Sequence, residues 1–280
     1  MLHREIWGSE VRPATPFRNA DAGLILASDG EEKSPMKSVL SAAMVLALLA
    51  LPGPARAQST DLLLVLAADV SRSIDETEFA LQRKGYSAAV TDPRVLAAIR
   101  GGTIGTIAIC FVEWSGAGEQ YVVADWTVVH DEEDAGGLAA AILAAPRSFI
   151  GRTSISGAID FAMERFAAAQ PRASRHIIDV SGDGTNNSGR PVTEARDQAL
   201  AEGVTINGLA IVNDKPNPGY AFHTQPPGGL PEWYRQNVIG GPGAFLRVVD
   251  DFHSFADAMT NKLVSEIAAL PPQRRAALLR

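Results

Sequence analysis

The chain has 280 residues, of which 46% are hydrophobic and 20% charged, with 25 Gly, 17 Pro and a single Cys. This composition excludes a disordered acidic tail and a collagen-like repeat, and one cysteine excludes an internal disulfide framework or a zinc site built on paired cysteines. The 25 basic and 32 acidic residues give a net charge of −7, without the basic excess that is typical of nucleic-acid-binding proteins. What remains is a globular protein of one large domain or two small ones.

Residues 36–57 have the layout of a secretory signal peptide. Lys37 supplies the positive charge, 39–51 form an apolar run, and Ala55-Arg56-Ala57 is a small-x-small cleavage motif. The run is shorter than the roughly 17 to 25 residues that a membrane-spanning helix needs. We therefore predict cleavage after Ala57 and a periplasmic or secreted mature chain with no membrane span; the alternative is an uncleaved anchor.

A polar, aperiodic stretch, residues 1–35, precedes this segment. A signal peptide begins at the true N-terminus, so we interpret 1–35 as a non-native extension and Met36 as the translation start, with Met1 as the alternative. Residues 1–57 contain six basic and six acidic side chains, so all seven excess negative charges lie in the mature chain. The expected organisation is completed by one domain over 58–270 and a C-terminal tail over 271–280.

Within this domain, apolar runs alternate with helical patterns. A capping box, with Asp75 as N-cap and Glu78 three residues later, predicts a helix that continues to Asp92-Pro93. Such alternation predicts a doubly wound, Rossmann-like α/β fold, with a mostly parallel sheet covered by helices on both faces. The expected strands are 62–68, 103–112, 121–129, 175–180, 204–212 and 245–249, and the further helices are 133–145, 154–169, 192–202 and 252–270.

Residues 213–243 are rich in Pro, Gly and Asn and are predicted to form a long loop. Four aromatic residues in it, Tyr220, Phe222, Trp233 and Tyr234, either pack on the sheet or present a binding surface. Packing is favoured because four exposed aromatic side chains would promote aggregation. The role of this loop is left open.

Oxygen-bearing side chains gather where strands are predicted to end. The segments are DVSRS at 69–73, GRTS at 151–154 and SGDGT at 181–185. Ligands of open α/β sheets bind beyond the carboxyl ends of the strands, and carboxylates and hydroxyls without neighbouring Cys or His suit Mg²⁺, or alternatively Mn²⁺ or Ca²⁺. The candidate metal ligands are Asp69, Ser71, Ser73, Thr153 and Asp183.

These three segments resemble, in order and approximate spacing, the metal-binding loops of von Willebrand factor type A domains with a metal-ion-dependent adhesion site. The resemblance covers about residues 60–269, and more narrowly the chain resembles bacterial secreted type A domain proteins of unassigned function. It implies hydroxyl ligation by Ser71, Ser73 and Thr153, with Asp69 and Asp183 acting directly or through water. It also implies that an acidic side chain of a partner protein completes the metal shell.

The match departs from the commonest pattern in two places. Ser154 follows Thr153 without the usual extra glycine, and Ser181-Gly182 precedes Asp183 where a threonine often stands. Neither departure removes a ligand oxygen. Possible accessory residues are Ser154, Gly184 and Trp114.

Other kinds of site fit less well. An EF-hand beginning at Asp69 would need Gly at Ile74 and Glu at Ala80, and the sequence contains no G-x-S-x-G nucleophile elbow. Cys110 lies within a predicted strand and is interpreted as a buried core residue. A non-catalytic binding module is favoured; a metal-assisted hydrolase and a purely structural metal site are the alternatives. The partner, the metal, the oligomeric state and any movement of the last helix are left open.

Overall fold

The computed structural model describes residues 58–212 and 219–268. The predicted extension 1–35, the signal peptide 36–57 and the tail 271–280 lie outside the described residues. Within the described ranges, no helix is both long enough and apolar enough to cross a membrane.

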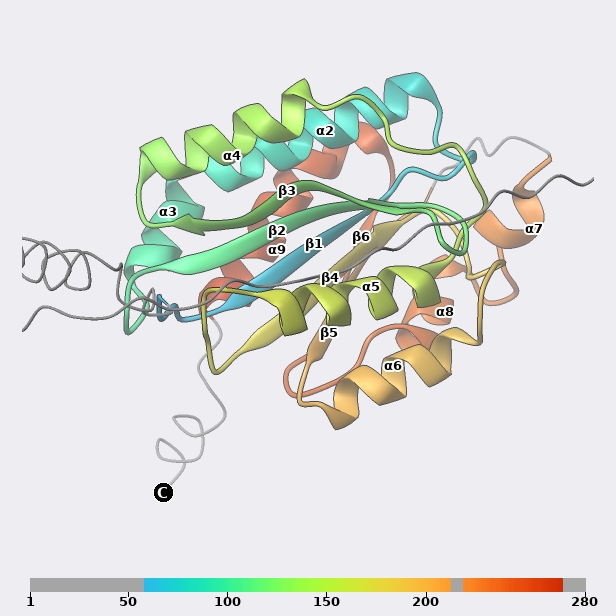
Figure 1. The fold of residues 1–280 in the computed structure, drawn as a ribbon. Helices are drawn as coiled ribbons and strands as arrows, with labels where there is room; N and C mark the ends of the chain where they lie inside the picture. Colours follow the sequence, from blue (N-terminus) through green and yellow to red (C-terminus); the bar gives the residue numbers. More distant parts are fainter. Residues whose placement is uncertain (1–57, 213–218, 269–280) are drawn as a thin grey trace, which may run out of the picture. The chain divides into compact units, whose positions relative to one another are not determined.

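Six strands form one sheet in the order β3-β2-β1-β4-β5-β6 (Figure 1). Only the β2–β3 pair is antiparallel; the other neighbours are parallel. All seven residues of β1 are buried, as expected for a continuous apolar run covered on both faces. The strands are β1 (Leu63–Asp69), β2 (Ile107–Trp114), β3 (Gln120–Val129), β4 (His176–Gly182), β5 (Thr205–Ile211) and β6 (Leu246–Val249).

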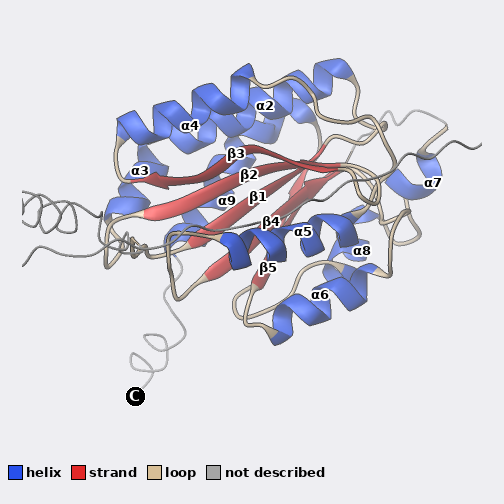
Figure 2. Ribbon diagram, viewed as in Figure 1, coloured by secondary structure: helices blue, strands red, loops and turns tan. Residues whose placement is uncertain are grey.

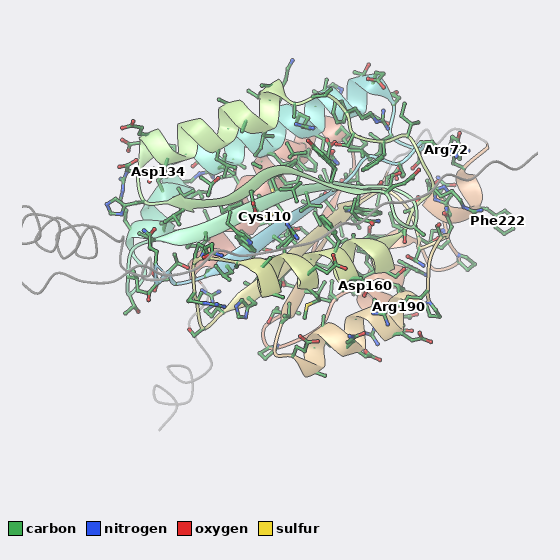
Figure 3. The ribbon with its side chains drawn as sticks, in the orientation of Figure 1. Arg72, Cys110, Asp134, Asp160, Arg190 and Phe222 are labelled. Carbon is green, nitrogen blue, oxygen red and sulfur yellow. The ribbon has the colours of Figure 1, made fainter. Side chains whose placement is uncertain are left out.

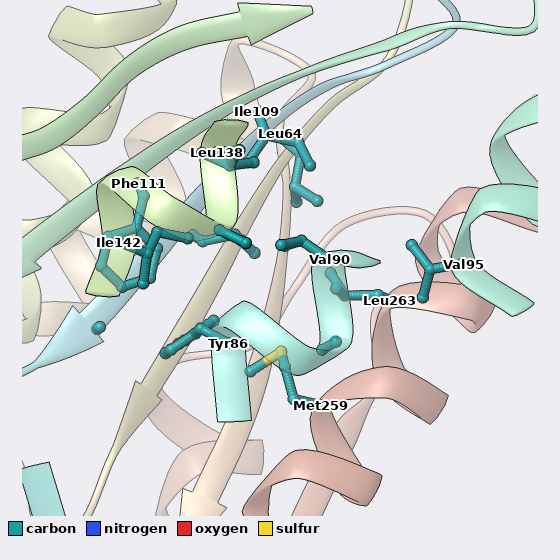
Figure 4. Packing of buried hydrophobic residues seen from close by; sticks show 14 of the residues in the cluster. Leu64, Tyr86, Val90, Val95, Ile109, Phe111, Leu138, Ile142, Met259 and Leu263 are labelled. Atoms are coloured by element: carbon teal, nitrogen blue, oxygen red, sulfur yellow. The ribbon is translucent and has the colours of Figure 1, made fainter. Parts of the chain in front are cut away.

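Helices cover both faces of this sheet (Figure 2). One core contains Leu64 and Leu66 of β1 with side chains of α2, α3, α4 and α9 (Figure 4), and the other contains Leu63 and Val65 with side chains of α5, α6 and α8. The predicted doubly wound, mostly parallel α/β fold is confirmed. The helices are α2 (Glu76–Thr91), α3 (Pro93–Arg100), α4 (Glu132–Ala144), α5 (Ile155–Ala168), α6 (Val192–Ala201), α7 (Ala221–Thr224), α8 (Leu230–Asn237), the 3₁₀ helix η1 (Phe252–Ser254) and α9 (Phe255–Ala268).

The strand order places the reversal of the winding between β1 and β4. After β1 the chain builds β2 and β3 on one side, and it then crosses to β4, β5 and β6 on the other. The loops that leave β1 and β4 therefore diverge at the carboxyl edge, where open α/β sheets bind their ligands.

The capping box of α2 is confirmed, because Asp75 accepts hydrogen bonds from the N–H groups of Thr77 and Glu78 while the Glu78 carboxylate accepts from Asp75 N–H. The expected start of the second strand at 103 is wrong: β2 begins at Ile107. The Asp61 carboxylate accepts hydrogen bonds from the N–H groups of 103–105, which holds these residues in a turn.

The predicted loop over 213–243 contains two helices, α7 and α8. Leu230 and Tyr234 of α8 lie one turn apart and are both buried in the α5–α6–α8 core, so tertiary burial favours a helix in this Pro- and Gly-rich segment. Trp233 packs against the same core, as the packing interpretation expected. That interpretation is wrong for Phe222, whose side chain is 100% exposed.

Candidate metal centre

The loop after β1 is held in shape by a buried carboxylate and an arginine. Asp69 ends β1, and its Oδ1 accepts a hydrogen bond from Ser71 N–H at 2.7 Å. The Arg147 guanidinium donates to the carbonyl oxygens of Val70, Ser71 and Ile74 at 2.8–2.9 Å. Three carbonyls on one guanidinium leave the loop little conformational freedom, so the hydroxyls of 71 and 73 are held at the end of the sheet.

The other two predicted segments contact this loop directly. Ser73 Oγ donates to Asp183 Oδ1 at 2.7 Å, just beyond β4. Thr153 Oγ1 donates to Ser71 Oγ at 3.2 Å, and the Ser71 and Ser73 hydroxyl oxygens are also 3.2 Å apart. The structure thus brings all five predicted ligand residues into one connected cluster, and Ser73 is the only one of the five that is not fully buried.

The segment that carries Thr153 is positioned by Asn187. The Asn187 side-chain oxygen accepts from Thr153 N–H at 3.0 Å, and Asn187 N–H donates to the Thr153 carbonyl oxygen at 2.8 Å. Asn187 lies after Asp183 on the same loop. The two loops therefore hold each other in place. The sequence analysis did not identify Asn187 or Arg147, because neither occupies a recognised ligand position.

The three possible accessory residues have different environments. Ser154 is the N-cap of α5, where its Oγ accepts from Gly157 N–H at 3.2 Å. Trp114 is fully buried in the α5–α6–α8 core and borders the β1 loop through its carbonyl oxygen, which accepts from Val70 N–H at 2.9 Å. A Cβ at Gly184 would lie 2.5 Å from His223 Nδ1, so the absence of a side chain at 184 lets His223 approach the loop.

Both carboxylates of the cluster are poorly compensated. Burial raises the pKa of Asp69 well above its usual value, and the neighbouring Asp183 carboxylate raises it further. Burial likewise raises the pKa of Asp183, to about 6. Asp69 Oδ2 is buried and has no hydrogen-bond partner in the structure. Two close carboxylates with one unpartnered oxygen fit a bound cation.

The donor set fits a hard divalent cation such as Mg²⁺, Mn²⁺ or Ca²⁺, because every candidate ligand is an oxygen. Within the described residues, no three His, Cys, Asp or Glu side chains gather into a metal-binding group. Three of the five candidate ligands, by their residue types, are neutral hydroxyls, and the two carboxylates supply the only formal negative charges among them.

Tyr234 approaches the cluster from the loop region. A Cβ atom added at Gly182 would lie 2.8 Å from the Tyr234 hydroxyl oxygen. It would lie 2.9 Å from Asp69 Oδ2. Only glycine fits at 182, and both of these oxygens are buried without a hydrogen-bond partner. Sequence reasoning noted Tyr234 only as one of four loop aromatics, because its position beside Gly182 of β4 depends on the placement of α8.

The raised pKa of Asp183 predicts a pH-dependent effect of replacing it. In EDTA, Asp183→Asn is expected to stabilise the domain by about 3 kcal/mol at pH 7.5 and by little at pH 4. The pKa of Asp183 is about 6 in the folded state, above its ordinary value of 3.8. Protonation of Asp183 therefore stabilises the folded wild-type domain below pH 3.8, and this stabilisation is lost as the pH rises through 6. Urea unfolding across this pH range checks this, and a difference that does not change with pH would contradict it.

In the comparison with protein families, the model of a family described as a protein of unknown function, DUF1194, matches residues 59–271. Comparison with curated protein sequences gives no match.

Several solved structures are similar in fold. Proximal thread matrix protein 1 from the mussel byssus, with a zinc-occupied MIDAS motif, matches with a TM-score of 0.55 and 15% identity over 75% of this chain and 49% of its own. A von Willebrand factor type A protein from Catenulispora acidiphila gives 0.53 and 15% over 74% and 43%. The pilus adhesin SpaC from Lactobacillus rhamnosus GG gives 0.52 and 14% over 75% and 30%. The chain spans less than half the length of each, and the likeness establishes a von Willebrand factor type A fold.

Proposed function

This chain belongs to the family of proteins of unknown function DUF1194, and we propose that it is an exported protein-binding module. Its von Willebrand factor type A fold supports this proposal. In this proposal a divalent cation, Mg²⁺ in the first place and otherwise Mn²⁺ or Ca²⁺, is held by the five residues of the cluster. The module acts in the periplasm or outside the cell, in keeping with the signal-peptide pattern at 36–57.

The observation that carries the proposal is that two carboxylates and three hydroxyls lie together, largely buried, at the carboxyl edge of the sheet. The hydroxyls of Ser71, Ser73 and Thr153 are linked to one another and to Asp183. The remaining carboxylate, Asp69, keeps one buried oxygen without a partner. A cation at this place would compensate both carboxylates, whose repulsion and burial are otherwise unfavourable.

A bound cation supplies a positive site that accepts a further oxygen ligand. Three of its five protein ligands would be neutral hydroxyls, which leave much of its charge for that ligand. An acidic side chain of a partner protein is the group that such a site favours. Two neighbours support this direction: the mussel protein has a zinc-occupied MIDAS motif, and the Lactobacillus rhamnosus GG protein is a pilus adhesin.

The second candidate is a metal-assisted hydrolase, and one observation favours it. His223 lies against Gly184, its Nδ1 is buried without a hydrogen-bond partner, and burial together with the Arg152 charge lowers its pKa. A neutral imidazole beside a metal site is a candidate general base. Turnover of ester or phosphate substrates that depends on both the metal and His223 would favour this function.

Asp183→Ala is expected to abolish metal-dependent partner binding while leaving the fold intact. In a pulldown from the periplasmic or secreted fraction, the wild-type domain should retain a partner in Mg²⁺ and lose it in EDTA. Asp183→Ala should behave in Mg²⁺ as the wild type does in EDTA. Asp197→Ala is the matched control, because Asp197 is exposed on α6 and outside the cluster.

Circular dichroism accompanies this experiment. A folded Asp183→Ala variant that no longer binds supports the proposal. An unfolded variant would instead support a purely structural metal site, and partner capture that is equal in Mg²⁺ and EDTA would overturn the proposed function.

A further inference from the structure

A hollow of about 330 Å³ adjoins the metal centre. It shares Thr153 with the cluster, and two of its residues are sequence neighbours of ligand residues: Arg72 lies between Ser71 and Ser73, and Arg152 precedes Thr153. A group bound in the hollow would therefore lie beside a group bound at the metal. The lining residues are Arg72, Arg152, Thr153, Asn187, Tyr220 and His223.

The two arginines are exposed and have no acidic partner in the described part of the chain. Arg72 Nε donates to the Gly151 carbonyl oxygen at 3.2 Å, and Arg152 Nη2 donates to the Asn187 carbonyl oxygen at 2.8 Å. No salt bridge of either arginine occurs among the described residues, whereas seven other arginines pair with carboxylates. Two guanidiniums held by backbone carbonyls, with donors left over, form a site for an anionic group.

An aromatic side chain stands at the same end of the molecule. Phe222 of α7 is 100% exposed, and Figure 3 shows it at the edge of the molecule where Arg72 lies. Tyr220 and His223, its close neighbours in sequence, line the hollow. Exposed aromatic side chains and arginines are enriched in protein–protein interfaces, so the surroundings of the hollow favour a polypeptide over a small ion as its occupant.

We propose that this hollow binds a second carboxylate of the partner, so that the recognised segment carries two acidic side chains close together. One carboxylate lies at the metal and the other between Arg72 and Arg152. In an extended segment, residues two apart point to the same side about 7 Å from each other, so an acidic-x-acidic sequence is the expected pattern. This inference rests on the proposed function and adds the chemistry of the partner segment to it.

Two synthetic peptides of equal length test the proposal, one with an Asp-Gly-Asp centre and the other with Asp-Gly-Asn. Their dissociation constants are measured by NMR titration of the folded domain in Mg²⁺ and in EDTA. The wild-type domain is expected to bind the doubly acidic peptide about tenfold more tightly in Mg²⁺, the size expected for one charge-assisted contact. In the Arg72→Gln/Arg152→Gln variant this ratio should fall to about one.

Arg100→Gln is the matched control, since Arg100 is exposed at the end of α3 and pairs there with Glu132. It removes one positive charge, where the double variant removes two, and it should keep the tenfold ratio. The Mg²⁺-dependent rise in melting temperature shows whether the metal centre of each variant is intact.

The possible failures are distinguishable. Equal affinity of the wild type for both peptides, with binding still dependent on Mg²⁺, would overturn this inference alone. An unchanged ratio in the double arginine variant would do the same. If neither peptide shows Mg²⁺-dependent binding to the wild type, the proposed function fails and this inference fails with it.

Discussion

A saturating concentration of Mg²⁺ is expected to raise the melting temperature of the wild-type domain by about 5–10 °C at pH 7.5, and to leave that of Asp69→Asn unchanged. A ligand at a hundred times its dissociation constant stabilises the folded state by about 2.7 kcal/mol. Each kcal/mol shifts the melting temperature of a domain of this size by about 2–4 °C. The Asn side chain keeps the shape of Asp69 but removes one of the two charges that would hold the cation.

The same variant is expected to behave differently in EDTA, where it should melt at a higher temperature than the wild type. Burial and the nearby Asp183 carboxylate make the charged form of Asp69 unfavourable in the folded state, and Asn removes that cost. Asp197→Asn, at an exposed position, should match the wild type in both conditions. Differential scanning fluorimetry with Mg²⁺, Mn²⁺, Ca²⁺ and EDTA gives both results, and equal Mg²⁺ shifts for wild type and Asp69→Asn would exclude a metal at this cluster.

Lys262→Met is expected to reduce the free energy of unfolding by about 3–5 kcal/mol at pH 7.5. Lys262 of α9 is fully buried, with its Nζ 2.7 Å from Asp179 Oδ1 of β4 and paired also with Glu266. Asn207 of β5 donates to the same Glu266 carboxylate at 2.8 Å. Methionine fills a similar volume but leaves the two buried carboxylates without their cation. Removing one partner of a buried ion pair is strongly destabilising, because the remaining charges are no longer compensated.

Urea unfolding measures this loss, and Lys84→Met is its matched control, because Lys84 of α2 is exposed.

The loss should also depend on pH. Burial raises the pKa of Asp179 to about 7, although the charge of Lys262 lowers it. At pH 5 the carboxyl is protonated in the folded state, so the loss caused by Lys262→Met should be smaller there. Replacing Asp179 and Glu266 by Leu in the same variant should restore stability. A loss no larger than that of Lys84→Met would show that the buried group does not hold α9 to the sheet.

Much of this protein follows from its sequence alone. Apolar runs that are continuous and not alternating predicted strands buried on both faces, and their alternation with helical patterns predicted the doubly wound sheet. Asp69 directly follows the predicted strand 62–68 and Asp183 lies three residues after the predicted strand 175–180, and parallel strands bring their carboxyl ends to one edge. That rule also placed Ser71 and Ser73 near Asp183, more than a hundred residues away, and the structure joins them. The signal peptide and the metal itself stay predictions.

Only the tertiary structure decided which other side chains surround those oxygens. Arg147 holds the β1 loop, the Tyr234 hydroxyl lies beside Gly182, and Phe222 is exposed where packing was expected. None of these follows from local pattern, because each depends on where a distant helix or loop comes to rest against the sheet. The Pro- and Gly-rich segment 213–243 reads locally as a loop, yet burial of Leu230 and Tyr234 against the core stabilises a helix there. Local periodicity therefore determined the elements and the edge at which the candidate site lies, and long-range packing determined the surface that a partner meets.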